Sequence, residues 1–170
     1  MAQCAILSLG SNVEPRFDYL RQAVAHLCKM AQSQVLRISP VYETEPVLTP
    51  SPDVDPDFLN CIVIVETDLE PLSFFTQTQE IELHLHRTRS VYGAPRTIDI
   101  DIISFGAWQI SQGPLILPHP RAHLRRFVLQ PLADLLPQYC LPGFSRTVSA
   151  LLADCTDHAA VVRYAASLTV

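Results

Sequence analysis

Apolar and polar positions along the chain follow two spacings, which predict strands and helices in a regular order. Apolar runs predict four strands, at about 3–10, 34–43, 58–66 and 97–105. Apolar residues at helical spacing predict one helix that starts near Pro15 and another that runs from Pro71 to about residue 87. The proline-rich residues 46–57 and residues 88–95 show neither spacing and are expected to be loops.

The order of these segments is β-α-β-β-α-β, which is typical of an α+β, ferredoxin-like fold. Such a core has a mostly antiparallel sheet, and we expect its helices to pack on one face. After it we expect a short strand at 107–111, a loop at 112–122, and helices near 127–136 and 145–154. These last segments form a C-terminal extension, and residues 1–170 are expected to be a single domain.

Composition narrows the class of protein. Apolar residues make up 48% of the chain, which favours a folded globular protein over a disordered one. No apolar run approaches the length of a membrane span, and no basic segment precedes a hydrophobic stretch at the N-terminus. We therefore expect a cytoplasmic protein with no membrane partner. The five cysteines form no Cys-x-x-Cys pair, which fits reduced cysteines in that compartment.

Charge is distributed unevenly along the chain. The net charge of −5 argues against a general nucleic-acid binder. Residues 87–126, however, hold six of the twelve basic residues and only two of the seventeen acidic ones. All six are arginines, at positions 87, 89, 96, 121, 125 and 126. Because the guanidinium fork suits phosphate oxygens, these residues predict a site for a small polyanion. The alternative is that the arginines only pair with acidic neighbours.

Two carboxylates, Asp99 and Asp101, interrupt an isoleucine-rich run in the fourth predicted strand. Side chains two residues apart on a strand share a face, so the two anions are expected side by side. Cations must accompany such a pair, because it repels itself and loses hydration. Arg96 is one candidate cation, and Mg²⁺ is another, since Mg²⁺ prefers carboxylate oxygens and shares its ligand shell with substrate phosphates. The alternative is an acidic strand face that meets water or arginines alone.

Six separated segments carry a resemblance to a known family. They are Leu9-Gly10-Ser11-Asn12, Tyr42–Val47, Phe58-Leu59-Asn60, Glu82–Arg89, Pro95–Ile102 and Leu117–Arg121, the last leading into Arg125–Leu129. In this order they resemble 6-hydroxymethyl-7,8-dihydropterin pyrophosphokinase, an enzyme of folate biosynthesis. The resemblance covers most of residues 5–137. It implies that ATP donates its β,γ-pyrophosphoryl group to the hydroxymethyl oxygen of the pterin and that AMP is released.

The resemblance also implies roles for particular residues. Asp99 and Asp101 would be the metal ligands, holding two Mg²⁺ ions on the triphosphate, and they would act with Arg87 and Arg96 in catalysis. The implied ATP-binding residues are Gln79, Glu82, Arg87, Arg89, Arg96, Ile102, His119 and Arg125. The implied pterin-binding residues are Thr44, Glu45, Val47, Phe58, Asn60, Tyr92 and Phe127.

Several of these residues have a simpler reading in isolation. Gln79 and Glu82 alone fit an ordinary solvated helix face. Phe58 and Phe127 alone fit core packing. Asn60 interrupts an apolar run, as the cap of a strand often does.

Residues 86–94 depart from the family pattern. His86 stands where the family commonly has glycine, and Tyr92 is expected to replace a tryptophan as a stacking lid over the pterin. We expect the loops 46–57 and 88–95 to close over both substrates. Two rival functions remain open: a non-catalytic ATP- or pterin-binding homologue, and a two-metal nucleotidyl transferase. The expected partners are ATP and the pterin, with no nucleic acid. The protein is expected to be a monomer, and a weak contact with neighbouring folate-pathway enzymes is left open.

Overall fold

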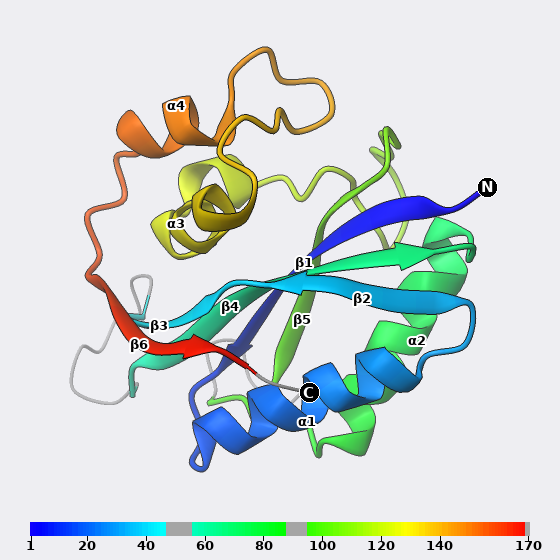
Figure 1. The fold of residues 1–170 in the computed structure, drawn as a ribbon, viewed down its shortest axis with the longest axis horizontal. Coiled ribbons are helices and arrows are strands. Elements are labelled where there is room, and N and C mark those ends of the chain that lie inside the picture. Colours follow the sequence, from blue (N-terminus) through cyan, green and yellow to red (C-terminus); the bar gives the residue numbers. More distant parts are fainter. Residues whose placement is uncertain (47–55, 88–94, 169–170) are drawn as a thin grey trace.

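The computed structural model describes residues 1–46, 56–87 and 95–168 (Figure 1). Six strands, four α-helices and one short 3₁₀ helix follow one another in these residues. They are β1 (Gln3–Ser11), α1 (Arg16–Lys29), β2 (Ser33–Ile38), β3 (Pro40–Thr44), β4 (Phe58–Thr67), α2 (Pro71–His84), β5 (Asp99–Phe105), η1 (Ala122–Leu124), α3 (Arg126–Leu135), α4 (Val148–Ala153) and β6 (Val161–Ser167). No helix in the described residues is both long enough and apolar enough to span a bilayer.

All six strands form one sheet, in the order β5-β1-β4-β3-β6, and β2 also pairs with β4. Every pairing is antiparallel. The single strand predicted at 34–43 is in fact two strands, which meet at Ser39. The buried Ser39 hydroxyl accepts a hydrogen bond from the backbone amide of Ile62 in β4 at 2.8 Å. This side-chain bond satisfies the Ile62 amide at the point where β2 ends and β3 begins.

Helices cover both faces of the sheet: α1 and α2, which belong to the predicted β-α-β-β-α-β core, share one face as expected, and the helices after β5 cover the other. Figure 1 shows α1 and α2 on one side, with α3 and α4 on the other. The reason lies in the central strands, which are apolar on both faces and need cover on both. On β4, Cys61 and Val63 pack in the cluster of α1 and α2, whereas Ile62 and Ile64 pack in the cluster of α3 and α4.

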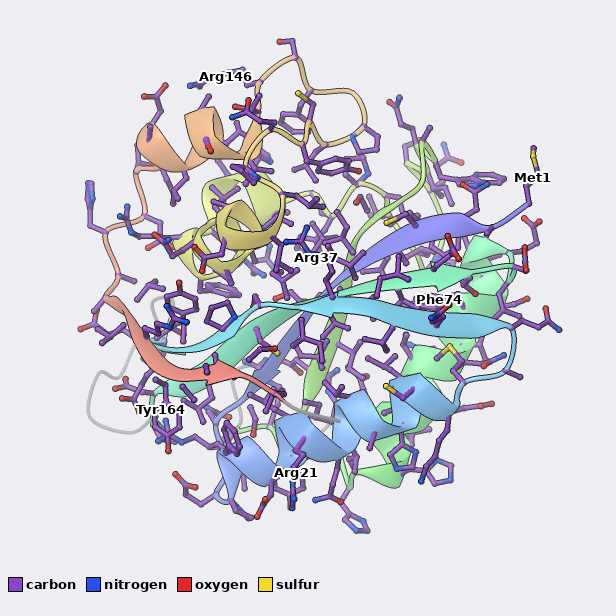
Figure 2. All side chains as sticks on the ribbon, in the orientation of Figure 1. Met1, Arg21, Arg37, Phe74, Arg146 and Tyr164 are labelled. Carbon is purple, nitrogen blue, oxygen red and sulfur yellow. The ribbon has the colours of Figure 1, made fainter. Side chains whose placement is uncertain are left out.

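Individual side chains bind these layers together. Phe74 of α2 meets Phe105 of β5 edge-on, with ring centroids 5.5 Å apart. Across the other face, Arg37 of β2 reaches the end of α3, where its Nη1 donates to the Leu135 carbonyl at 2.8 Å (Figure 2).

The residues after β5 differ from the prediction at two points. The strand expected at 107–111 is reduced to an isolated bridge between Ile110 and Leu117. In addition, β6 was not predicted at all. Most of its side chains are exposed, so it lacks the apolar run or clean alternation by which a strand is recognised in a sequence. It pairs with β3 and forms one edge of the sheet.

Candidate active site

A row of four residues crosses the sheet at one end of β1. Gly10 of β1 lies opposite Asp99 of β5 on one side and opposite Asn60 of β4 on the other, and Asn60 in turn lies opposite Tyr42 of β3. Directly opposed residues of an antiparallel sheet point to the same face. Two strand spacings, about 10 Å, separate Asp99 from Asn60. The fold therefore brings a predicted metal ligand and a predicted pterin residue to one face.

That face is the one covered by α3. The Tyr42 hydroxyl donates a short hydrogen bond to Asp134 of α3. Burial, and then the Asp134 carboxylate, raise the pKa of Tyr42 to about 12. Tyr42 therefore stays protonated and ties β3 to α3 beside the row.

Three predicted pterin residues lie together at the ends of β3 and β4. The buried Asn60 amide donates from Nδ2 to Oγ1 of the buried Thr44 at 2.6 Å. Thr44 lies opposite Phe58 in the pairing of the two strands. The guanidinium of Arg96 lies 5.4 Å from the centroid of the Phe58 ring. A polar amide and an aromatic ring thus adjoin an arginine that was assigned to ATP.

Glycine at position 10 leaves room for the Asn60 amide in this arrangement. A Cβ there would lie 2.6 Å from Oδ1 of Asn60 and 3.7 Å from a ring carbon of Phe58. Gly10 belongs to the Leu9–Asn12 segment that carries the family resemblance, and its role depends on Asn60, which is distant in sequence.

Asn12, in the same segment, also has a role that the sequence did not reveal. Its side-chain oxygen accepts a hydrogen bond from the backbone N–H of Arg96 at 2.7 Å, and the backbone N–H of Asn12 donates to the Arg96 carbonyl at 3.1 Å. Asn12 is buried. It fixes the backbone of Arg96 against the end of β1, which places that guanidinium between Phe58 and Asp99.

Carboxylates and arginines alternate between the end of α2 and the start of β5. Oδ1 of Asp99 lies 2.8 Å from Nη2 of Arg87, and Oδ2 lies 3.1 Å from Nε of Arg96. Arg87 also forms a short ion pair with Glu82, whose Oε1 accepts a hydrogen bond from the Ile100 amide at 2.7 Å. Burial raises the pKa of Asp99, and the two arginines oppose that shift.

Glu82 does not lie on a solvated helix face, so the simpler reading of this residue is wrong. Its side chain is on the buried side of α2 and is 4% exposed. Burial raises its pKa, and the bond from Ile100 and the charge of Arg87 act in the opposite direction. An open pocket beside it is lined by Gln79, Glu82, Leu83 and Arg87. Three predicted ATP residues therefore meet at the end of α2.

His119 lies within electrostatic reach of Asp101. Burial lowers the pKa of His119, and the Asp101 charge opposes that shift. Nδ1 of His119 accepts a hydrogen bond from the Arg121 amide at 3.2 Å, which leaves Nε2 as the protonated ring nitrogen. The imidazole is thus a neutral donor beside the second carboxylate.

The donor set fits a hard divalent cation. Asp99 and Asp101 are half-buried on one face of β5, two residues apart. Oδ1 of Asp99 is buried and makes no hydrogen bond, although Arg87 is close. Within the described residues, no group of three or more His, Cys, Asp and Glu side chains forms a cage. Carboxylate oxygens are ligands that Mg²⁺ prefers, and Mg²⁺ takes its other ligands from water and phosphate.

The remaining predicted residues are placed differently. Phe127 lies at the start of α3, with the Arg125 guanidinium 5.4 Å from its ring centroid, and packs against the apolar cluster of α3 and α4. Ile102 is buried in the cluster of α1 and α2, on the opposite face of β5 from Asp99. Glu45 pairs with the segment before β6. Val47, Arg89 and Tyr92 lie outside the described residues.

His86 follows the end of α2 with a φ of +62°. This left-handed region favours glycine, because a Cβ is crowded there. The conformation gives a physical reason for glycine at this position in the resembling family.

The model of the 7,8-dihydro-6-hydroxymethylpterin-pyrophosphokinase family matches residues 6–137. The 2-amino-4-hydroxy-6-hydroxymethyldihydropteridine pyrophosphokinase of Bacillus subtilis is 44% identical over 138 residues, which cover 81% of each chain. The enzyme of the same name from Pseudomonas aeruginosa is 36% identical over 156 residues. The matched region covers 91% of this chain and 93% of the Pseudomonas chain.

Solved structures share the fold. A Plasmodium falciparum HPPK-DHPS structure with pterin and p-hydroxybenzoate matches with a TM-score of 0.70 at 17% identity. The match covers 90% of this chain and 43% of the Plasmodium chain. This chain therefore corresponds to less than half of the longer Plasmodium protein.

Proposed function

The chain belongs to the 7,8-dihydro-6-hydroxymethylpterin-pyrophosphokinase family, and from this we infer that it transfers the pyrophosphoryl group of ATP to 6-hydroxymethyl-7,8-dihydropterin. The acceptor is the hydroxymethyl group, the products are AMP and the pterin diphosphate, and the pathway is folate biosynthesis. The observation that carries this assignment in the structure is the row on the sheet. It sets the Asp99 carboxylate and the Asn60 amide on one face, with only Gly10 between them.

We propose that the phosphate side of the site is built on Asp99 and Asp101 as ligands for two Mg²⁺ ions. When bound, the ions would neutralise the triphosphate and the charge that develops on AMP as it leaves. The buried Oδ1 of Asp99, which is paired with the Arg87 guanidinium but accepts no hydrogen bond, supports this role. Arg87 and Arg96 both pair with Asp99, so their guanidinium groups would lie close to the phosphate oxygens of a nucleotide whose Mg²⁺ ions are bound by that carboxylate.

ATP contacts are proposed for the residues around this centre. Gln79, Glu82 and Arg87 line one pocket at the end of α2, which supports a nucleotide site there. Neutral His119 would donate from Nε2 to a phosphate oxygen. Arg125 would add charge from the start of α3. Arg89 completes the proposed set, and Ile102 is proposed to contribute only its backbone, because its side chain is buried on the opposite face of β5.

The pterin is proposed to lie over the ends of β3 and β4. A flat, amide-bearing ring needs stacking partners and a polar group at its edge. Asn60 and Thr44 form a buried polar pair for the ring edge, and Phe58 and Phe127 are the stacking candidates. Glu45, Val47 and Tyr92 are proposed to complete the pocket.

The fold class, the domain organisation, the compartment and the oligomeric state are also proposed. The strand order β5-β1-β4-β3, with α1 and α2 on one face, supports a ferredoxin-like core, and the residues after β5 are read as its C-terminal extension. We propose that residues 1–170 form one pterin pyrophosphokinase domain, acting as a cytoplasmic monomer on small-molecule substrates.

The test is product analysis by chromatography. The protein is incubated with Mg²⁺, ATP and 6-hydroxymethyl-7,8-dihydropterin, and AMP and ADP are separated. We expect AMP and the pterin diphosphate in equal amounts and no AMP when the pterin is omitted. Formation of ADP, or no turnover, would reject the assignment.

A further inference from the structure

The connector between α4 and β6, residues 155–160, lies beside both walls of the proposed pterin pocket. Figure 1 shows it running from α4 past α3 to the edge of the sheet. It lies outside residues 6–137, the part that the family model matches. No function had been assigned to it from the sequence.

The first wall is the start of α3, which carries Phe127. Helix α3 has no side-chain cap of its own. Asp157 of the connector takes that place, because its Oδ2 accepts a hydrogen bond from the Arg126 amide at 2.9 Å. Its other oxygen accepts a bond from the Ala159 amide at 3.0 Å. A carboxylate at this position satisfies a free amide and interacts favourably with the positive end of the helix dipole.

The second wall is the end of β3, which carries Thr44 and Glu45. The Glu45 amide donates to the Ala160 carbonyl at 3.2 Å, and the Ala160 amide donates to Oε2 of Glu45 at 3.0 Å. The next residue, Val161, pairs with Thr44 at the start of β6. The connector therefore joins β3 within three residues of Asp157.

We propose that Asp157 is a positioning residue for the pterin, acting through the two walls that the connector joins. By capping α3 and holding the chain that pairs with Glu45, it fixes Phe127 relative to Thr44 and its partner Asn60. The hydrogen bonds of the Asp157 carboxylate go to the amides of Arg126 and Ala159, and neither residue is a proposed substrate contact or metal ligand. The inference rests on the proposed function, because it assumes that these walls bind the pterin.

The variant Asp157→Ala removes both acceptor atoms and tests this role. We expect KM for the pterin to rise about tenfold, which corresponds to the loss of one helix cap. KM for ATP is expected to rise no more than about threefold, through Arg125, which directly precedes the capped amide, and kcat is expected to change less than twofold, because Arg87, Arg96 and Asp99 are held by contacts that do not involve the connector. A purely structural role would lower the amount of active enzyme without separating the two KM values.

Asp154→Ala is the matched control. Asp154 lies three residues earlier, at the end of α4, and its carboxylate pairs with the exposed Arg146 on the outer surface of the molecule (Figure 2). Both KM values are expected to equal those of the unmodified protein. Should Asp157→Ala fail to fold, Asp157→Asn retains one acceptor oxygen, and an intermediate rise in KM for the pterin is expected.

A KM for the pterin within twofold of the unmodified value, or parallel rises in both KM values, would overturn the inference. This outcome is distinct from failure of the proposed function, in which the unmodified protein forms no AMP. Fluorescence titration of the pterin in the presence of a non-hydrolysable ATP analogue measures affinity without turnover. It is expected to show the same tenfold difference between the unmodified protein and Asp157→Ala.

Discussion

Oδ1 of Asn60 lies 2.6 Å from the point where a Cβ at Gly10 would stand. The Asn60 amide is held in that place by its bond to Thr44, so it cannot turn away freely. Glycine at this position of β1 therefore lets an amide on β4 lean over the neighbouring strand, toward the side on which Asp99 lies.

Gly10→Ala is expected to displace the Asn60 amide and to lower the affinity for the pterin about fivefold to tenfold, the cost of one buried hydrogen bond. KM for ATP should change little, because the new methyl group faces Asn60 and Phe58. Steady-state kinetics with each substrate varied in turn measures the difference. In an Asn60→Ala background, Gly10→Ala should add almost nothing, and additive effects would contradict this coupling.

Asp99→Asn and Asp101→Asn should each lower kcat about 10³-fold or more, because the carboxylate charge that holds the metal is lost. Removal of Mg²⁺ with EDTA should abolish AMP formation, and added Mg²⁺ should restore it. Asp18→Asn, which changes an exposed aspartate paired with Arg21, is the control and should retain full activity. Undiminished turnover in either site variant would remove the metal-ligand role from that residue.

Glu82→Gln keeps an oxygen for the Ile100 amide but loses the charge that faces Arg87. We expect the fold to survive and KM for ATP to rise about tenfold, the effect of one charge-assisted bond. Glu80→Gln lies two residues away on the exposed side of α2 and should behave like the unmodified protein. Equal KM values in both variants would show that Glu82 has only a structural role.

Tyr42→Phe leaves the Asp134 carboxylate without its phenol donor and should lower the free energy of unfolding by about 1–2 kcal/mol. The control is Tyr164→Phe, which removes the hydroxyl of an exposed ring and should cost little. Denaturant unfolding at neutral pH measures both. An unfolding free energy for Tyr42→Phe equal to that of the control would rule out a stabilising role for this bond.

The same bond gives a pH dependence. Folding raises the pKa of Tyr42 from its ordinary value of 10.0 to about 12, first through burial and then through Asp134. The contribution of the hydroxyl is therefore complete below pH 10 and is lost as the pH rises toward 12. The difference in unfolding free energy between the unmodified protein and Tyr42→Phe should shrink over that interval. A constant difference would contradict the assignment.

Local pattern predicted the parts of the site that lie on one element. Asp99 and Asp101 share a face because a strand alternates at every residue, and this held in the structure. The Leu9–Asn12 segment marked the end of β1 without revealing what it does. Its functions depend on Asn60 and Arg96, which are distant in sequence and reach it only through strand pairing and loop packing.

The sequence by itself determined the central strands and main helices, the paired carboxylates and the family, because these depend on the residue types and the spacing within short segments. Tertiary structure decided that Asp99, Gly10, Asn60 and Tyr42 form one row, that Glu82 is buried, and that Asp157 caps α3. Strand register and layer packing set these relations. They join residues 18 to 89 positions apart, and no local spacing encodes them.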